Sequence, residues 1–483
     1  MTRTEAGAAG QFVLDAPAWD RLERRLERAL ALARRGGGRA VASVTVATPA
    51  GLDLAAAVLA ARRAQDHCFC LEQPASDNHA VCGLGSAAVF EASGPDRAGA
   101  VAQACRALGA RTFADEPALD AGAPAATGPI FCGGLSFAPD GGRSPQWAGF
   151  APAQFVLPEI SLARQADRAR MTVNVAVDGD ESASSMLERV RVRLDELRAV
   201  ESPLLDPDPV SRPRVAGAAP PSHYEEAVRR AVERIRFGEL EKVVLAREVH
   251  VHAGHDIDPA PVHAALTAVF PECYCYLVGA PGATFLGASP ELLMRRNGAR
   301  AQTVALAGTT RRSADPAVDD HLGEQLRQSP KDRDEQAIVA WRIQRALEPV
   351  SLWVGGADEP SLVKVHNVQH LATPIRAQLS TPVSALELAG RLHPTPAVGG
   401  EPAAVAEPLI PALEGLDRGW YAGAIGWMDL AEDGEFFVAL RCALLRGPLA
   451  RLYAGCGIVR DSEPAAELAE SEIKLQALLP LLA

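Results

Sequence analysis

Apolar side chains recur along the chain with two periods, and the change from one period to the other predicts its helices and strands. In the first half, helical spacing predicts helices at Asp20–Arg35, Asp96–Leu108 and Met186–Val200. β-rich runs bounded by Gly, Pro and Asp predict strands between them. These runs are Val41–Ala47, His67–Leu71, Ala80–Phe90, Ile130–Phe137, Phe155–Leu162 and Met171–Val177.

The second half continues this mixture. Helices are predicted at His223–Phe237, Ala317–Gln328, Lys331–Leu347 and Val383–Leu392. Strands are predicted at Lys242–Val251, Cys273–Val278, Thr284–Leu286, Leu292–Arg296, Ala301–Ala305, Leu362–Val368, Gly423–Asp429, Phe436–Leu445 and Leu449–Ala454. Because few of these segments follow in β-α-β order, the pattern favours an α+β fold with large antiparallel sheets.

A last helix is predicted from Ala466 towards the C-terminus. Its leucines form one apolar stripe, and Glu467, Glu470 and Lys474 line up beside that stripe at three- and four-residue spacing. Two carboxylates one turn apart, followed by an ammonium group, could hold a divalent cation and an anionic substrate together. The alternative is a solvated helix face with a Glu470–Lys474 ion pair.

The Pro-rich connector Glu201–Ser222 is the expected boundary in the chain. It divides an N-terminal lobe, residues 1–213, which we expect to contribute strands and helices to a shared fold, from a region at 214–483 that carries most of the candidate chemistry. Two sheets can still pack across such a connector, so independent domains are not implied.

Composition narrows the class of protein. With 48% hydrophobic residues the chain can bury a large core, and its net charge of −12 argues against nucleic acid or an anionic membrane as a partner. Residues 1–20 lack the apolar core of a signal peptide. The most apolar region, Pro261–Met294, is interrupted by prolines and glycines, so we predict no membrane span.

The nine cysteines are scattered and include no C-x-x-C pair. That pattern favours small core residues in a reducing cytoplasm over a disulfide framework or a zinc site.

Two side chains could exchange protons with a substrate. Lys242 opens a predicted strand, and burial would lower its pKa so that the amine could act as a general base; the alternative is a frayed strand end. Glu291 follows Pro290 at the start of an apolar run, where a raised pKa would suit a general acid, although an exposed turn carboxylate is the plainer interpretation.

Other polar positions could bind anions or a metal. Arg441 lies inside a predicted core strand and needs an anionic partner such as a substrate carboxylate. Ser329 and Pro330 look like the start of a helix, which places Glu335 in its second turn, either as a third metal carboxylate or as a partner of Lys331. Gly455 lacks a Cβ, so its backbone could approach a ligand closely.

Three further segments set polar groups in tight or apolar surroundings. They are Ala307-Gly-Thr-Thr-Arg-Arg312, which is either an anion-binding loop or an ordinary polar loop, His370-Leu-Ala-Thr-Pro-Ile375 and Leu392-His-Pro-Thr-Pro-Ala-Val-Gly-Gly400.

Taken in order, these motifs resemble the chorismate-utilising enzymes, and most closely the isochorismate synthases among them. The resemblance covers Ser222–Ala483 motif by motif and extends more weakly to the N-terminal half. The motifs that carry it are KVVLAR, GASPELL, LAGTTRR, KDRDE, HLATPI, LHPTPAVGG, YAGAIGW, ALRCA, AGCGIV and ELAESEIKL. The resemblance implies the chorismate-binding fold shared with anthranilate and aminodeoxychorismate synthases, in which two large antiparallel sheets pack as a sandwich with helices outside.

The resemblance also implies roles for single residues. Lys242 would activate water for attack at C2 of chorismate, and Glu291 would protonate the departing C4 hydroxyl. Mg²⁺ would be held by Glu335 and Glu470, with Glu467 nearby or acting through water. The implied substrate-binding residues are Arg441, Tyr421, Lys474, the Gly455 backbone, Gly308, His370 and Ala397.

The same motifs distinguish related activities within the family. The ammonia-using members lack a lysine at the base position and pair with a glutaminase; Lys242 is present here, so we expect no glutaminase subunit. Salicylate synthases, which also eliminate pyruvate, keep the lysine but tend to carry a threonine where this chain has Ala397. Salicylate synthase is therefore the nearest alternative, and a catalytically inactive binding protein is the alternative from another class.

The remaining expectations concern the setting of the enzyme. We expect a cytoplasmic monomer or weak homo-oligomer that needs no organic cofactor. The sequence leaves menaquinone, siderophore, salicylate and specialised-metabolite biosynthesis open as pathways for the product.

Overall fold

The structure, a computed structural model, describes residues 11–116, 123–205, 213–365 and 368–482. Within these ranges the chain forms two large sheets, of 13 and 10 strands, with helices around them, as the α+β prediction expected. The larger sheet runs β10 (Arg214–Gly217), β11 (Lys242–His252), β23 (Leu449–Ile458), β22 (Cys442–Arg446), β13 (Ala283–Ser289), β12 (Tyr274–Ala280), β2 (Cys68–Gln73), β3 (His79–Leu84), β8 (Ile160–Gln165), β9 (Arg168–Val177), β1 (Ala40–Thr48) and β5 (Thr112–Phe113), with β19 (Gly400–Glu401) paired to β11.

The smaller sheet supplies the second layer. It runs β16 (Ser351–Gly356), β18 (Val368–Leu379), β15 (Arg300–Arg311), β14 (Leu292–Asn297), β21 (Gly434–Val438), β20 (Ala424–Asp429), β6 (Ile130–Leu135), β7 (Ala153–Leu157) and β4 (Ala88–Ala92), with β17 (Ser361–Lys364) paired to β18. The helices are α1 (Ala16–Gly36), α2 (Leu54–Ala60), α3 (Arg97–Gly109), α4 (Ala183–Glu196), α5 (Pro221–Arg236), α6 (Pro259–Val269), α7 (Pro316–Gln328), α8 (Pro330–Leu347), α9 (Ala385–Leu392), α10 (Ala403–Glu414), α11 (Pro464–Leu475) and α12 (Leu479–Leu482).

The two sheets pack face to face through large side chains. Tyr274 of the larger sheet stacks on Phe437 of the smaller one, with ring centroids 5.1 Å apart and an interplanar angle of 10°. Tyr276 also contacts Phe437, at 5.0 Å. A second core lies between the other face of the larger sheet and α1, α2 and α6, which contribute buried leucines such as Leu26 and Leu266. This layering confirms the predicted sandwich with outer helices.

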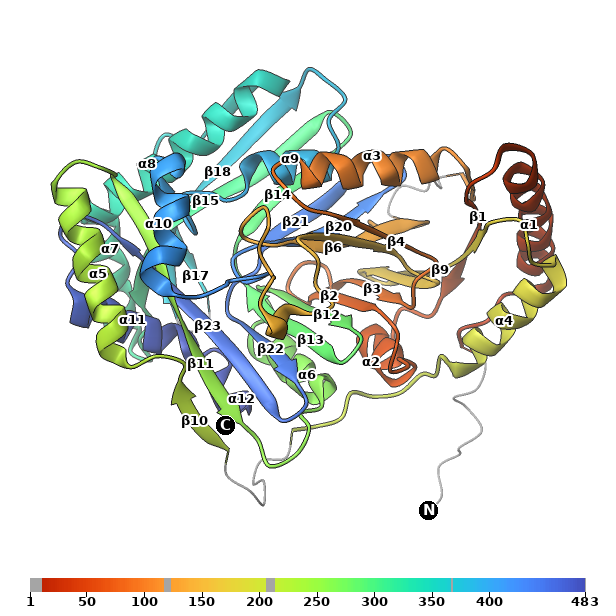
Figure 1. Ribbon diagram of the computed structural model, residues 1–483, viewed down its shortest axis with the longest axis horizontal. Helices are drawn as coiled ribbons and strands as arrows, with labels where there is room; N and C mark the ends of the chain where they lie inside the picture. Colours follow the sequence, from red (N-terminus) through yellow and green to blue (C-terminus); the bar gives the residue numbers. More distant parts are fainter. Residues whose placement is uncertain (1–10, 117–122, 206–212, 366–367, 483) are drawn as a thin grey trace.

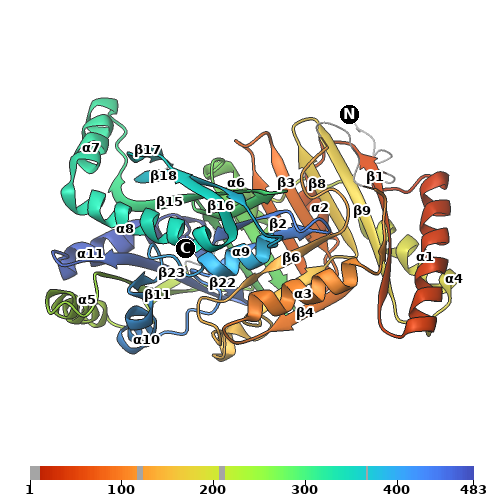
Figure 2. The same ribbon diagram turned by 90° about the horizontal axis from the view of Figure 1, so that it is seen from above.

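The helices are divided between the two ends of the molecule. Figures 1 and 2 both show α1 and α4 at one end, while α5, α8, α10 and α11 gather at the opposite end around β11 and β23. Among the described residues, no helix is both long enough and apolar enough to cross a membrane.

Helices with a strong apolar stripe lie where the sequence predicts them. α1 contains the whole predicted segment Asp20–Arg35, and α8 begins one residue before the predicted Lys331 start. The Ser329 side chain accepts a hydrogen bond from the Asp332 amide, which confirms the predicted helix cap. These elements are fixed by local pattern, because the capping group and the apolar stripe both lie within the segment.

Three predicted strands are wrong in the same way, because each is two strands that belong to different sheets. Ala80–Phe90 divides into β3 and β4, Phe155–Leu162 into β7 and β8, and Phe436–Leu445 into β21 and β22. The chain turns between the layers at Gly85 with φ 71° and at Arg441 with φ 47°. These strands are almost entirely buried, except for the partly exposed β4. The apolar run therefore continues across each turn and hides it.

Other elements were missed. The predicted strand Leu362–Val368 covers three of the four residues of β17 and the first residue of β18, and residues 366–367 lie outside the described ranges. Helices α2, α6 and α10 and the short strands β10 and β16 were not predicted. α10 contains Pro408 and Pro411, and α6 lies in an almost uniformly apolar segment, so neither shows the usual helical signal.

Strands from both sides of residue 213 share each sheet. In the larger sheet β2 pairs with β12, and in the smaller sheet β6 pairs with β20. The division into 1–213 and 214–483 stays a prediction about the chain, but each sheet needs both parts.

Candidate active site

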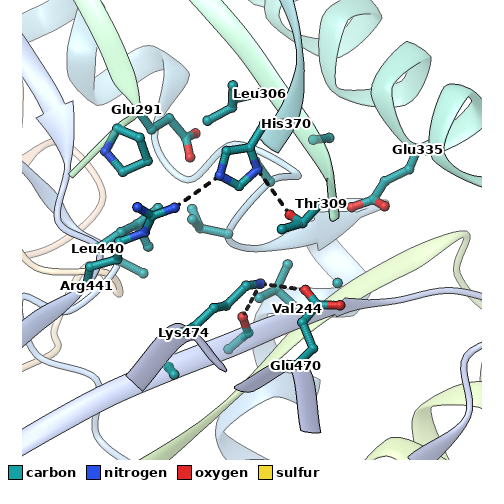
Figure 3. A pocket seen from close by; sticks show the side chains of 18 of the residues that line it. Val244, Glu291, Leu306, Thr309, Glu335, His370, Leu440, Arg441, Glu470 and Lys474 are labelled. Atoms are coloured by element: carbon teal, nitrogen blue, oxygen red, sulfur yellow. Dashed lines mark hydrogen bonds and ion pairs between the residues drawn. The ribbon is translucent and has the colours of Figure 1, made fainter. Parts of the chain in front are cut away.

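A cavity of about 280 Å³ opens at the end of the sandwich where α8 and α11 meet β11 and β23. All the predicted site residues line it except Gly308, whose carbonyl lies 3.3 Å from His370 Nδ1 behind the cavity wall. The lining residues among them are Lys242, Glu291, Glu335, His370, Ala397, Tyr421, Arg441, Gly455, Glu467, Glu470 and Lys474. Segments more than 200 residues apart in the sequence therefore converge here, as Figure 3 shows for ten labelled side chains.

Lys242 is buried at the first position of β11. Only 1% of its side chain is exposed, and its Nζ lies 2.7 Å from Glu335 Oε1 on α8. A frayed strand end is therefore wrong for this residue. The pair is possible because position 457 of the neighbouring β23 is a glycine: a Cβ there would lie 2.8 Å from Glu335 Oε1 and 2.9 Å from Lys242 Cε.

Glu291 lies at the junction between β13 and β14. Its side chain is buried, and burial raises its pKa to about 8, although Lys242 and Lys474 pull that pKa in the opposite direction. The Glu291 amide donates to Ser289 Oγ at 3.2 Å, which fixes the turn that carries the carboxyl group into the cavity. A carboxyl group with this pKa is mostly protonated at neutral pH, so it can donate a proton.

Arg441 does not lie inside a core strand, contrary to the prediction. It occupies the turn between β21 and β22 in the left-handed region, with φ 47°, because the chain changes sheets there. This conformation is costly for a residue with a Cβ. The guanidinium reaches the cavity and donates from Nη2 to His370 Nε2 at 3.1 Å.

His370 is held as a neutral imidazole. Burial, with smaller contributions from Arg441 and Lys474, lowers its pKa to about 3. Since arginine can only donate, Nε2 of His370 must be an acceptor and its proton must lie on Nδ1. Nδ1 is 3.1 Å from Thr309 Oγ1 and 3.3 Å from Gly308 O, which are its available acceptors.

Lys474 projects from α11 into the cavity beside Glu470 (Figure 3). Its ammonium donates to Gly455 O at 2.9 Å and pairs with Glu470 Oε1 at 2.8 Å. Burial raises the pKa of Glu470, but Lys474 and Lys331 outweigh that effect and the net pKa is lowered. The Glu470–Lys474 pair was predicted as one interpretation of this helix, and the structure places it inside the cavity, not on a solvated face.

Three potential ligand atoms could hold a metal ion near these residues. Ligand atoms of Cys456, Glu467 and Glu470 lie within 4.8 Å of one another. Burial raises the pKa of Glu467, and Lys331 Nζ lies 3.8 Å from its carboxylate. Glu335 is outside this group and is paired with Lys242 instead. The carboxylates of Glu467, which is buried, and Glu470, which is half-buried, supply the hard oxygen donors that Mg²⁺ prefers, so the donor set fits that ion.

Tyr421 and the loop that carries Ala397 and Val398 complete the wall. The Tyr421 ring stacks on Tyr453 with centroids 5.2 Å apart, and a Cβ at Gly455 would lie 2.9 Å from the Tyr421 hydroxyl. Gly455 is therefore required for the close approach of β23 to Tyr421, which is a packing reason for the glycine beyond ligand access.

Sequence reasoning missed several lining residues. Asp332 lies one helical turn before Glu335, and burial raises the pKa of its carboxyl group. Its i, i+3 spacing to Glu335 was a usable signal. Lys331 and Thr309 also line the cavity. Leu306 and Leu440 could not have been identified, because an apolar residue in an apolar run gives no sign of which cavity it borders.

Comparison with known proteins agrees with this geometry. A model of the family described as chorismate binding enzyme matches residues 26–483. Isochorismate synthase MenF of Bacillus subtilis (strain 168) is 37% identical over 361 residues, covering 74% of this chain and 75% of that protein. The salicylate biosynthesis isochorismate synthase of Pseudomonas aeruginosa is 40% identical over 355 residues, covering 72% of this chain and 73% of that protein.

Solved structures show the same fold. MenF, the menaquinone-specific isochorismate synthase from Escherichia coli, matches with a TM-score of 0.77 at 25% identity, covering 96% of this chain and 100% of that chain. Anthranilate synthase component I from Streptococcus pneumoniae TIGR4 matches with a TM-score of 0.61 at 21% identity, covering 72% of this chain and 80% of that chain. At that identity the second match concerns the fold alone.

Proposed function

Because this chain belongs to the chorismate-binding enzyme family, we propose that it is an isochorismate synthase, which converts chorismate to isochorismate. Water would form a bond to C2 of the ring while the bond from C4 to its hydroxyl breaks and the double bonds shift between them. One water enters and one leaves, so the reaction is an isomerisation without oxidation or reduction. No organic cofactor is required.

The observation that carries the proposal is that a buried lysine, Lys242, and a buried carboxyl group, Glu291, line the same cavity. Lys242 takes the proton of the attacking water at Nζ, and the adjacent Glu335 carboxylate stabilises the ammonium group that results. Glu291 donates its proton to the departing C4 hydroxyl, and its pKa of about 8 keeps it in the acid form at neutral pH.

The cationic groups of the cavity would bind the carboxylates of chorismate. Arg441 and Lys474 are half-buried donors that suit the enolpyruvyl carboxylate, with Tyr421 and the Gly455 backbone beside them. His370 cannot compete as a cation, because its imidazole is neutral, and it orients the Arg441 guanidinium from behind. Gly308 supports His370 through its carbonyl, and Ala397 leaves space at the wall.

A divalent cation, Mg²⁺, would be held by Glu470 and Glu467, with Glu335 as the third carboxylate in the same cavity. When bound, the ion would neutralise the ring carboxylate and withdraw electron density from the ring. The other cavity residues would bind the rest of the substrate independently of that role.

Salicylate synthase is the second candidate, because one similar protein is named for salicylate biosynthesis. Elimination of pyruvate would follow the same first step, so the two activities share Lys242 and Glu291. The small Ala397 at the wall favours release of isochorismate.

The direct test is incubation of the purified protein with chorismate and Mg²⁺, followed by chromatography of the products. Isochorismate as the main product supports the proposal. Fluorescent salicylate with an equal amount of pyruvate indicates the second candidate, and unchanged chorismate overturns both.

We also propose a cellular compartment, an oligomeric state and a pathway for the enzyme. All nine cysteines are buried, which suits a cytoplasmic enzyme, and the chain is expected to act without a glutaminase subunit, as a monomer or weak homo-oligomer. The similar proteins serve menaquinone and salicylate biosynthesis by their names, and either route could consume the product here.

A further inference from the structure

The buried ion pair of Glu414 and Arg418 lies beside β11, where, among the described residues, the edge of the larger sheet lacks a neighbouring strand. The outer edge of β11 is paired with β19 at Lys242 and Val243 and with β10 from Val249 onward. Between these pairings, side chains replace a strand: Val244 O accepts from Arg418 Nη2 at 2.9 Å, and the Ala246 amide donates to Glu414 Oε1 at 2.7 Å.

Glu414 and Arg418 form a closed unit. Arg418 donates from Nε to Glu414 Oε2 at 3.0 Å and from Nη2 to Glu414 Oε1 at 2.5 Å. Both side chains are essentially inaccessible to water, with 2% and 0% exposed for Arg418 and Glu414. The Arg418 guanidinium also lies over the Phe137 ring, 4.2 Å from its centroid. An arginine held on every side in this way has a single orientation.

Arg418 reaches a second segment of the cavity wall with its Nη1 group. Its Nη1 donates to Val398 O at 2.8 Å, so one guanidinium joins β11 to the loop that carries Ala397 and Val398. The same loop packs directly on the lysine strand: Val244 N donates to Gly399 O at 2.7 Å, and a Cβ at Gly400 would lie 2.6 Å from Lys242 O.

Both tethered segments face the cavity, whereas Arg418 does not line it. Val244 and Val398 are lining residues, and Lys242 is two residues before Val244 on the same strand face. We propose that the buried Glu414–Arg418 pair is a positioning device that fixes the Lys242 amine relative to the Ala397–Val398 wall. This inference rests on the proposed function and deepens it, since it names residues that hold the base in place without touching substrate.

The chemistry of arginine explains why another residue cannot replace it. The guanidinium presents its donors in a rigid planar fork, and here that fork serves one carboxylate and two carbonyls at once. A lysine would keep the charge against Glu414 but could not reach Val244 O and Val398 O in the same geometry. Arg418→Lys therefore removes the hydrogen bonds to Val244 O and Val398 O while keeping the positive charge beside Glu414.

The expected result of Arg418→Lys is a fall in kcat of about 10- to 100-fold, because small displacements of a catalytic group have effects of this size. KM for chorismate should stay within about threefold of the original, since the cationic groups that bind its carboxylates are on other elements. Glu414→Gln keeps an acceptor for the Ala246 amide and should give a smaller fall in kcat of the same kind.

The matched control is Arg164→Lys on β8. Arg164 is also a buried arginine that donates to two carbonyls, Asn78 O at 3.0 Å and Leu52 O at 2.9 Å, and pairs with Glu72. It does not line the cavity. A general effect of loosening a buried arginine would appear in both variants, whereas positioning predicts a change in kcat for Arg418→Lys alone.

A readout that does not use catalysis is amide hydrogen exchange in the full chain. The segments 242–246 and 393–401 should exchange faster in Arg418→Lys than in the original protein and in Arg164→Lys. If Arg418→Lys does not fold, Glu414→Gln is judged by the same two measurements.

An unchanged kcat in the variants, an equal loss in Arg164→Lys, or a loss carried by KM overturns the inference. If the original protein forms no isochorismate, the proposed function fails. Hydrogen exchange then tests by itself whether Arg418 holds the Ala397–Val398 loop in place, and unchanged exchange in 393–401 rejects that role.

Discussion

At the residue scale, titratable groups in the cavity differ in charge because their surroundings differ. Burial raises the pKa of Glu291 and lowers that of His370, so that at neutral pH both are uncharged. Glu470 keeps its charge because Lys474 lies 2.8 Å away. The result is an acid, a neutral donor and an ion pair within one small volume, and each has a distinct effect when it is replaced.

Lys242→Ala should abolish conversion of chorismate, with a loss of about 10²- to 10⁴-fold expected for removal of a general base. Binding of chorismate should be largely retained, because Arg441 and Lys474 are unchanged. Steady-state kinetics and direct binding by calorimetry check the two parts separately. Normal turnover in this variant would refute the assignment of the base.

The pH dependence of kcat should report Glu291. Its carboxyl group must be protonated to donate, and its raised pKa means that the acid form is present below about pH 8 and lost above it. Activity should therefore fall on the alkaline side of about pH 8, and Glu291→Gln should lose most activity together with this alkaline fall. A profile for the original enzyme that stays flat to about pH 9.5 contradicts the assignment.

Glu470→Gln should weaken Mg²⁺ binding by at least about tenfold and reduce activity in parallel, since loss of a ligand costs no less than loss of its supporting groups. Calorimetric titration with Mg²⁺ measures the first effect without catalysis. Glu472→Gln, on the same helix with its side chain 60% exposed, is the matched control. An unchanged titration in Glu470→Gln removes this residue from the metal site.

At the element scale, the site depends on strands that turn from one sheet to the other. Arg441 reaches the cavity because β21 ends and β22 begins around it in different layers. β23 passes close to both α8 and Tyr421, and its glycines at 455 and 457 leave room for the Tyr421 hydroxyl and for the Lys242–Glu335 pair. The paths of the strands therefore fix the distances between side chains that come from different parts of the sequence.

Gly457→Ala should reduce kcat by about 10- to 100-fold, because the added methyl group would displace the Lys242–Glu335 pair. Gly355→Ala on β16 is the control, since the nearest atom to its added Cβ is 3.6 Å away, an ordinary contact. Kinetics with circular dichroism as a check on folding test this pair. Equal activity in the two variants would show that the spacing at position 457 is not critical.

At the scale of the whole molecule, the two sheets form one interlocked body because strands from both halves of the chain enter each sheet. The stacked pair of Tyr274 and Phe437 joins the layers near the turn that carries Arg441. Stability and the shape of the cavity should therefore change together when this interface is weakened.

Phe437→Ala should lower the free energy of unfolding by about 3–5 kcal/mol, as expected for a large cavity in a core. Phe437 is fully buried, whereas Leu352 is 73% exposed, so Leu352→Ala is the control and should change stability little. Urea denaturation monitored by fluorescence measures both. A loss below about 1 kcal/mol for Phe437→Ala would mean that the interface repacks around the gap.

The sequence by itself determined the elements whose signal is local and the identity of the chemical groups. Local sequence is enough to predict a capped amphipathic helix such as α8 and the regular spacing of carboxylates on α11. This is because helix formation depends on contacts between residues one turn apart. Tertiary structure alone decided where buried runs change sheets, since a strand that is covered on both faces is uniformly apolar on each side of the turn. Tertiary structure also decided that Lys242 pairs with Glu335 and that Arg418 joins β11 to Val398 through hydrogen bonds. Contacts between segments far apart in the sequence produce no periodic pattern from which they could be predicted.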